Sequence, residues 1–158
     1  MYIIASYESL IKSVQYMLDR LRVARMTVAR GFGSVVLHDV IIPLSVQRKE
    51  MFVSIVLNLY ILSGSLISQT SLPCYLPNAA KAREKFITSL RKLPVVQQGL
   101  FHNMKLDFIY YYAYTLAMKD LIHELEKMGV TLKELFGEIS FTRGAFFEDL
   151  NKSISKDV

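Results

Sequence analysis

The sequence predicts an all-α fold, a bundle of five to seven helices with one proline-rich connecting loop. Hydrophobic residues make up 52% of the 158 residues, which is enough for one domain with a real core but not for two. These residues recur at helical spacing over two long stretches. The chain has only seven Gly and four Pro, too few for a turn-rich β protein. We therefore expect one helical domain over residues 1–158.

The first helix is predicted to begin near Tyr7, where apolar residues alternate in steps of three and four. The members of this stripe are Tyr7, Leu10, Val14, Met17, Leu21, Ala24 and Val28, and Ile11 and Leu18 widen it. Such spacing gathers the apolar side chains on one broad helix face. Gly31 and Gly33 are expected to end or bend this helix. Residues 34–43 fit a strand by their β-branched content or a buried helix by their neighbours, and we favour the helix.

The next segment, residues 51–80, carries no charged residue. Its densest part, residues 51–67, is close to the length of about 20 apolar residues that a membrane span needs. Arg48 and Lys49 flank one end, as they would flank a span. Two interpretations follow: a transmembrane helix, or the central helix of the bundle, apolar all round because other helices surround it. We favour the central helix.

A proline-rich loop is predicted after this helix. Pro73 and Pro77 forbid a continuous helix and favour extended backbone. Asn78 is a good N-cap for a helix that runs to about Lys92.

The C-terminal third is expected to hold three helices. A long amphipathic helix is predicted over residues 101–128, with Gly129 as its stop. Thr131 followed by Glu134 resembles a capping box for a short helix that ends at Phe136. A last helix is expected over residues 141–154.

No set of residues indicates catalysis. Asp120 and His123 lie three residues apart and could share a metal on one helix face, but no second ligand cluster accompanies them, so a solvated face is the better interpretation. Cys74 cannot form an internal disulfide because it is the single cysteine, and no base can be placed beside it. We expect no enzyme, and no cofactor, metal or identifiable small-molecule ligand.

The charge is unevenly distributed along the chain. Residues 1–100 carry twelve Lys or Arg against five Asp or Glu, whereas residues 101–158 carry seven against nine. A basic body suits an anionic membrane surface or an acidic partner, although an ordinary solvated basic face explains it equally well. No RNA-binding, zinc-finger or basic-zipper signature is present, so no nucleic-acid partner is expected.

Residues 71–83 read Ser-Leu-Pro-Cys-Tyr-Leu-Pro-Asn-Ala-Ala-Lys-Ala-Arg. This segment resembles a signature in the C-terminal domain of fungal brefeldin-A-sensitivity-related proteins, also described as aromatic-acid-exporter-like transporters of the endoplasmic reticulum. Residues 21–25 and 48–62 resemble, in the same order, the family's arginine-bearing helix and the apolar helix before its proline motif. The resemblance extends over residues 10–140, and the matching motif positions are Leu72, Pro73, Tyr75, Leu76, Pro77 and Arg83.

In that family a multi-span membrane region precedes this domain, and the resemblance places the domain on the cytosolic side. The present chain is short, lacks that region ahead of it, and has Cys74 where the family pattern has another proline. We therefore expect a fragment or domain-only relative of a larger membrane protein, without transport activity of its own. The motif is expected to be structural: a loop that locks one helix onto the next, with Leu72, Tyr75 and Leu76 inserted between helices.

Together these features predict a non-enzymatic accessory helical domain of a fungal membrane transporter-like protein of unknown substrate. Its expected partners are a membrane surface or transmembrane helices, at the cytosolic face of the endoplasmic reticulum or another membrane. The alternative is a soluble helical protein-interaction module with no membrane role, cytoplasmic if the chain stands alone. Full enclosure of residues 51–67 favours the soluble module, and an exposed apolar surface there favours the membrane.

Overall fold

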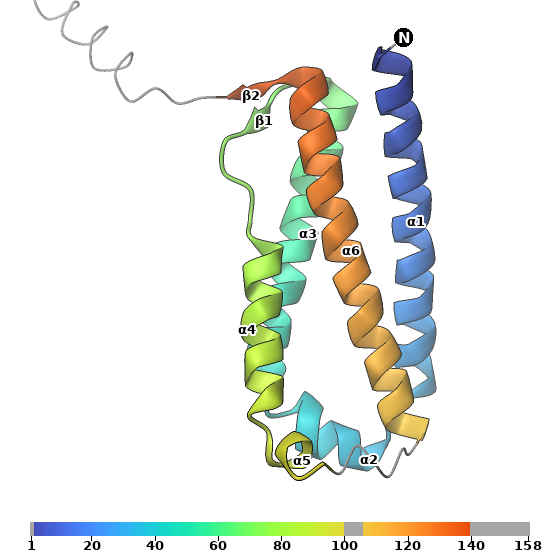
Figure 1. The fold of residues 1–158 in the computed structure, drawn as a ribbon, viewed down its shortest axis with the longest axis vertical. Coiled ribbons are helices and arrows are strands. Elements are labelled where there is room, and N and C mark those ends of the chain that lie inside the picture. Colours follow the sequence, from blue (N-terminus) through green and yellow to red (C-terminus); the bar gives the residue numbers. More distant parts are fainter. Residues whose placement is uncertain (1, 100–105, 140–158) are drawn as a thin grey trace, which may run out of the picture.

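Helices dominate the computed structural model, which describes residues 2–99 and 106–139 (Figure 1). Within these residues the predicted all-α bundle is confirmed. Two strands of two residues each pair in parallel, with Leu72 beside Glu138 and Pro73 beside Ile139. The elements are α1 (Tyr2–Arg30), α2 (Gly33–Val36), the π-helix η1 (Leu37–Ile41), α3 (Ser45–Ser68), β1 (Leu72–Pro73), α4 (Ala79–Arg91), α5 (Pro94–Gln97), α6 (Leu106–Phe136) and β2 (Glu138–Ile139).

Four long helices, α1, α3, α4 and α6, run along the same axis (Figure 1). The most extensive contact joins α1 to α6; α3 packs along α4 and also touches α6. No contact of comparable extent joins α1 to α3 within the described residues. The short helices α2 and α5 lie at one end of the bundle, and the two strands lie at the other (Figure 1). The result is an open arrangement in which α6 carries α1 on one side and the α3–α4 pair on the other.

The turn after α1 forms as the glycines predict. Gly31 and Gly33 have φ angles of 75° and 71°, in the left-handed region that glycine adopts without steric cost. The Gly31 amide donates to the carbonyl oxygen of Val28 at 3.0 Å, which terminates the helix. Of residues 34–43, those up to Ile41 are helical, as favoured, in the form of α2 and η1, and residues 42 and 43 form a turn.

The core is made by one buried stripe from each long helix. Leu10, Met17 and Ala24 of α1 are buried where this helix packs on α6. Phe86 of α4 and Met51 of α3 are the largest fully buried side chains. Burying a side chain of this size stabilises the fold by about 1.5–3 kcal/mol.

Helix α6 does not end where the sequence predicts. It runs through Gly129 and Thr131 to Phe136, so the expected stop and the separate short helix are both wrong. Gly129 is buried, and a Cβ built on it would lie 3.4 Å from Leu76 Cδ1, so this glycine makes room for a neighbouring side chain. The hydroxyl of Thr131 donates to the carbonyl of Lys127 in its own helix instead of capping a new one.

The true end of α6 is at another glycine. Gly137 has a φ of 83°, and its amide donates to the carbonyl oxygen of Lys133 at 2.9 Å. Residues 101–105 of the predicted long helix lie outside the described residues, and so does the helix expected over residues 141–154.

Candidate functional site

Helix α3 has one buried face and one exposed face, although its residues from Met51 to Ser68 carry no charge. The buried positions recur every three or four residues: Met51, Ile55, Asn58, Leu62 and Ser65. The favoured interpretation, an enclosed central helix, is therefore wrong. The physical reason is that only α4 and α6 pack on α3 to any extent, because α1 lies against α6 instead.

The exposed side of α3 carries large apolar side chains. Val46, Tyr60 and Ile67 are 71%, 77% and 83% exposed, and Val53 and Leu57 are also exposed. In sequence order these five residues are separated by seven, four, three and seven positions, so they lie on one side of the helix. We call this side the outer face of α3. In the part of the chain that the structure describes, α3 alone is long and apolar enough to cross a membrane, and only 28% of its most apolar stretch is buried.

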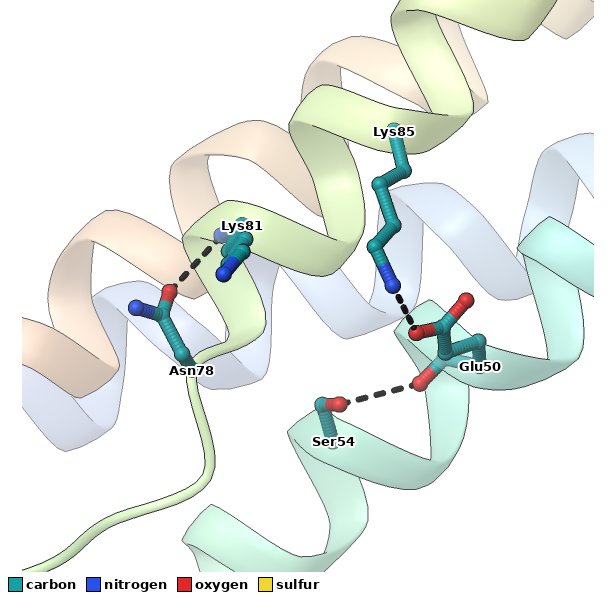
Figure 2. Close-up of polar contacts among 5 residues, drawn as sticks. All are labelled: Glu50, Ser54, Asn78, Lys81 and Lys85. Atoms are coloured by element: carbon teal, nitrogen blue, oxygen red, sulfur yellow. Dashed lines mark hydrogen bonds and ion pairs between the residues drawn. The ribbon is translucent and has the colours of Figure 1, made fainter.

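A polar edge of α4 meets α3 at the border of the outer face, where Glu50 lies one turn after Val46. Lys85 Nζ pairs with Glu50 Oε1 at 2.7 Å, and Ser54 Oγ donates to the Glu50 carbonyl at 3.0 Å (Figure 2). At the start of α4, the Asn78 side chain accepts a hydrogen bond from the Lys81 amide at 2.7 Å, which confirms the predicted N-cap (Figure 2). Both members of the ion pair are about half-exposed, so the pair orients the helices more than it stabilises them.

A groove of about 430 Å³ opens between α1 and α3, with α6 at its base. We refer to it as the α1–α3 groove. One cation, Arg25, lies on its wall among apolar and aromatic side chains. The lining residues are Leu21, Ala24, Arg25, Val28 and Ala29 of α1, Phe52 of α3, and Tyr114 and Met118 of α6.

The walls of the groove continue along both helices. On α1, the exposed residues Tyr7, Ile11, Leu18, Leu21 and Val28 follow steps of four, seven, three and seven. On α3, Phe52 is followed by exposed Val56 and half-buried Leu59, again in steps of four and three. Each wall therefore presents an apolar stripe parallel to the bundle axis.

An aromatic cluster lies beside the groove. The ring of Phe32 meets Tyr111 edge-on at 5.5 Å and Tyr114 at 5.9 Å between centroids. Burial raises the pKa of Tyr111 and Tyr114 above the ordinary tyrosine value; each phenol keeps its proton although the positive charge of Arg48 acts in the opposite direction. The Tyr111 hydroxyl is buried with no hydrogen-bond partner among the described residues.

The proline motif lies at the far side of α3 from this groove. Leu72 is fully buried, Leu76 and Pro77 are half-buried, and Pro73 pairs with Ile139 across the two strands. Tyr75 is 82% exposed and is not inserted between helices, so that part of the expectation is wrong. The reason is that Pro73 and Pro77 hold the loop extended, so that successive side chains point in different directions.

The remaining candidate residues lie apart from the groove and from the outer face of α3. Arg83 is half-buried, and its Nε atom has no hydrogen-bond partner among the described residues. Cys74 is exposed. Asp120 accepts a hydrogen bond from the Tyr16 hydroxyl at 3.3 Å and pairs with Arg20 at 3.6 Å, so this carboxylate joins α6 to α1. The described residues contain no group of three metal-binding side chains.

Comparison with known proteins identifies no relative. No protein-family model matches the chain, and neither the curated proteins nor the solved structures contain a significant match. The resemblance of residues 71–83 to brefeldin-A-sensitivity-related proteins therefore stays a prediction from the motif.

Proposed function

We propose that this chain is a non-enzymatic helical docking domain that binds at the surface of a membrane through the outer face of α3. The observation that carries the proposal is the exposure of that face. It holds five large apolar side chains, whereas the opposite face of α3 is buried against the bundle. A soluble monomer rarely leaves so many large apolar side chains on one side of a helix in water. Insertion of these side chains into the headgroup and acyl boundary would contribute several kcal/mol, at about 25 cal/mol per Å² removed from water.

The charge distribution supports the same orientation. Lys49 is exposed on α3 between Val46 and Val53, and it has no ion-pair partner among the described residues. A lysine beside an apolar helix face can reach anionic headgroups while the apolar residues insert, and each such cation contributes about 1 kcal/mol near a charged surface.

Peripheral binding fits the neighbours of α3 better than a membrane span does. Helix α4 packs along α3 and exposes Lys81, Glu84 and Lys85. If α3 crossed the bilayer with α4 still attached, these charges would enter hydrocarbon, where each costs at least about 2.5 kcal/mol. We therefore favour a helix that lies in the plane of the interface.

The motif resemblance supports a particular setting for this activity. A domain like that of the brefeldin-A-sensitivity-related proteins would lie at the cytosolic face of the endoplasmic reticulum or another membrane, next to a transporter-like protein. On this proposal the chain has no catalytic role and acts by holding its partner at the membrane surface.

Vesicle flotation tests the proposal. We expect the chain to float with vesicles that contain phosphatidylserine and to release when salt rises from about 50 mM to 500 mM, because screening weakens the attraction of Lys49 and its neighbours. Replacement of both Leu57 and Tyr60 by Gln should abolish flotation, whereas Tyr112→Gln, at an exposed position of α6, should leave it unchanged. Failure of the wild-type chain to float at low salt would contradict the proposal and favour the soluble interaction module. Flotation that resists alkaline carbonate would instead indicate a span.

A further inference from the structure

The α1–α3 groove has the form of a seat for one more helix. Its walls, α1 and α3, both rest on α6 but make little contact with each other. An α-helix is about 10 Å wide with its side chains, and its ridges fit between the ridges of two neighbouring helices. The exposed stripe of α1 extends from Tyr7 to Val28, which corresponds to about 30 Å of helix at 1.5 Å per residue. A partner helix of about 20 residues would therefore fill the groove.

The lining determines which face of such a helix would enter. The walls are apolar, with Leu21 and Val28 of α1 opposite Phe52 of α3, and Met118 at the base. Side chains on the entering face must then be apolar and must recur at helical spacing, which is how amphipathic helices are bound in grooves. Polar residues on the other faces of the bound helix would stay in water.

The positive charge at one end of the groove determines which residues should lie beside the apolar stripe of the bound helix. Arg25 lies in the groove wall, and Lys49 lies one turn before Phe52 on α3. Because α1 and α3 run in opposite directions, both cations lie toward the same end of the groove (Figure 1). Neither has an ion-pair partner among the described residues, and none of the groove-lining residues is acidic. Carboxylates at the matching end of a bound helix would pair with both.

From this shape and charge we propose that the groove binds an amphipathic helix of a partner protein, with an apolar stripe and acidic residues beside the stripe near one end. The inference adds the chemistry of the partner to the proposed docking function, and it depends on that function only for its setting at a membrane. A second copy of this chain is a poorer occupant, because its own groove face offers the same cations and no carboxylate. A lipid surface is also poorer, because a bilayer is flat and the groove is concave.

Binding of synthetic peptides tests this inference without any membrane. The probes are three fluorescent peptides of about 20 residues that form amphipathic helices. The first carries a leucine stripe with Glu beside it in one half, the second has Lys at those positions, and the third has the composition of the first in scrambled order. Fluorescence anisotropy at 150 mM salt measures the affinity of each. We expect the acidic peptide to bind at least tenfold more tightly than the other two.

Matched variants locate the binding. Leu21→Gln should weaken binding of the acidic peptide at least tenfold, and Met26→Gln, at an exposed position of the same helix outside the groove, should change it less than twofold. Phe52→Gln is a second groove variant on α3, in case Leu21→Gln unfolds the chain. Arg25→Glu should reverse the preference in favour of the lysine peptide, whereas Arg22→Glu, whose side chain pairs with Asp19, should not.

Several results would overturn the inference. Equal binding of the scrambled peptide, or no effect of either groove variant, would show that the groove does not bind an amphipathic helix. A concentration-dependent dimer that Leu21→Gln abolishes would identify a second copy as the occupant. Loss of vesicle flotation in Leu21→Gln, with no peptide bound by the wild type, would identify the membrane. Vesicle binding without peptide binding would refute this inference alone, and peptide binding without vesicle binding would refute only the proposed membrane role.

Discussion

The side-chain amide of Asn58 donates a hydrogen bond to the carbonyl oxygen of Pro77 at 2.7 Å. This bond joins the middle of α3 to the end of the proline-rich loop, and Asn58 is itself buried. A buried amide on an apolar helix would be costly if it had no partner. The asparagine that dilutes the apolar run in the sequence is therefore the residue that ties the loop to the bundle.

Replacement of Asn58 by Ala should lower the free energy of unfolding by about 1–2 kcal/mol, because it removes a part-buried hydrogen bond and leaves the Pro77 carbonyl oxygen with the Ala79 amide as its donor. Ser63→Ala is the matched control, since its hydroxyl donates only to the Tyr60 carbonyl of its own helix and is exposed. Urea unfolding followed by circular dichroism measures both. Equal destabilisation by the two changes would refute a locking role for Asn58.

Pro73→Ala and Pro77→Ala should each lower stability by about 0.5–1 kcal/mol. Proline restricts the unfolded chain and alanine restores its conformational freedom; both rings are half-buried, so lost packing acts in the same direction. The exposed neighbour Cys74 provides the control, because Cys74→Ala changes neither backbone freedom nor burial. Unchanged melting midpoints in both proline variants would contradict the view that these residues set the path of the loop.

Replacement by alanine should change the free energy of unfolding in opposite directions at two glycines that have open space around them. Neither Gly64 nor Gly31 would bring a new Cβ within 4 Å of another atom. Gly64 lies inside α3, so Gly64→Ala should raise the free energy of unfolding by about 0.5–1 kcal/mol through helix propensity. Gly31 has a φ of 75°, so Gly31→Ala should lower it by about 1 kcal/mol. Thermal melts of both variants test the pair, and a shift of the same sign in both would count against the turn geometry.

Tyr111→Phe should leave stability at pH 7 unchanged or raise it by up to about 1–2 kcal/mol, because the buried hydroxyl that it removes has no hydrogen-bond partner among the described residues. The pH dependence should also change. Burial raises the pKa of Tyr111 and Tyr114 above their unfolded value of about 10, so the folded state favours the neutral phenols. Their contribution to stability is fully present below pH 10 and is lost as the pH rises toward the folded values.

The measurement is urea unfolding of Tyr111→Phe and wild type from pH 7 to 11. The variant should lose stability less steeply above pH 10, and Tyr112→Phe, at an exposed position, should follow the wild type. Identical alkaline slopes for Tyr111→Phe and wild type would contradict the burial of this phenol.

Local chemistry allowed much of the fold to be predicted from the sequence. The spacing from Tyr7 to Val28 predicts α1, Gly31 predicts its end, and Asn78 predicts the start of α4, because each depends on contacts within one or two turns. The stop expected at Gly129 fails for a non-local reason: its small size is required by Leu76, which is distant in the sequence. The insertion expected of Tyr75 fails because a loop sequence does not specify which side chains point inward.

The candidate site was only partly predictable. The apolar run over residues 51–67 is the same whether a helix is enclosed or exposed, and only the number of neighbouring helices distinguishes the two. The signal for the groove was present in α1, where Ile11 and Leu18 widen the apolar stripe beyond what one neighbour can cover. That excess indicates a second contact surface, but its position against Phe52 depends on where α6 places the two walls.

Depth-dependent fluorescence quenching tests directly whether the outer face of α3 enters a membrane surface. The chain contains no tryptophan, so Tyr60→Trp places a single reporter on that face and Tyr112→Trp places one on the exposed side of α6. With vesicles of brominated phosphatidylserine, we expect a blue shift and strong quenching for Tyr60→Trp, and neither for Tyr112→Trp. Unquenched emission from Tyr60→Trp in the presence of vesicles, or equal quenching of both reporters, would contradict insertion of the outer face of α3.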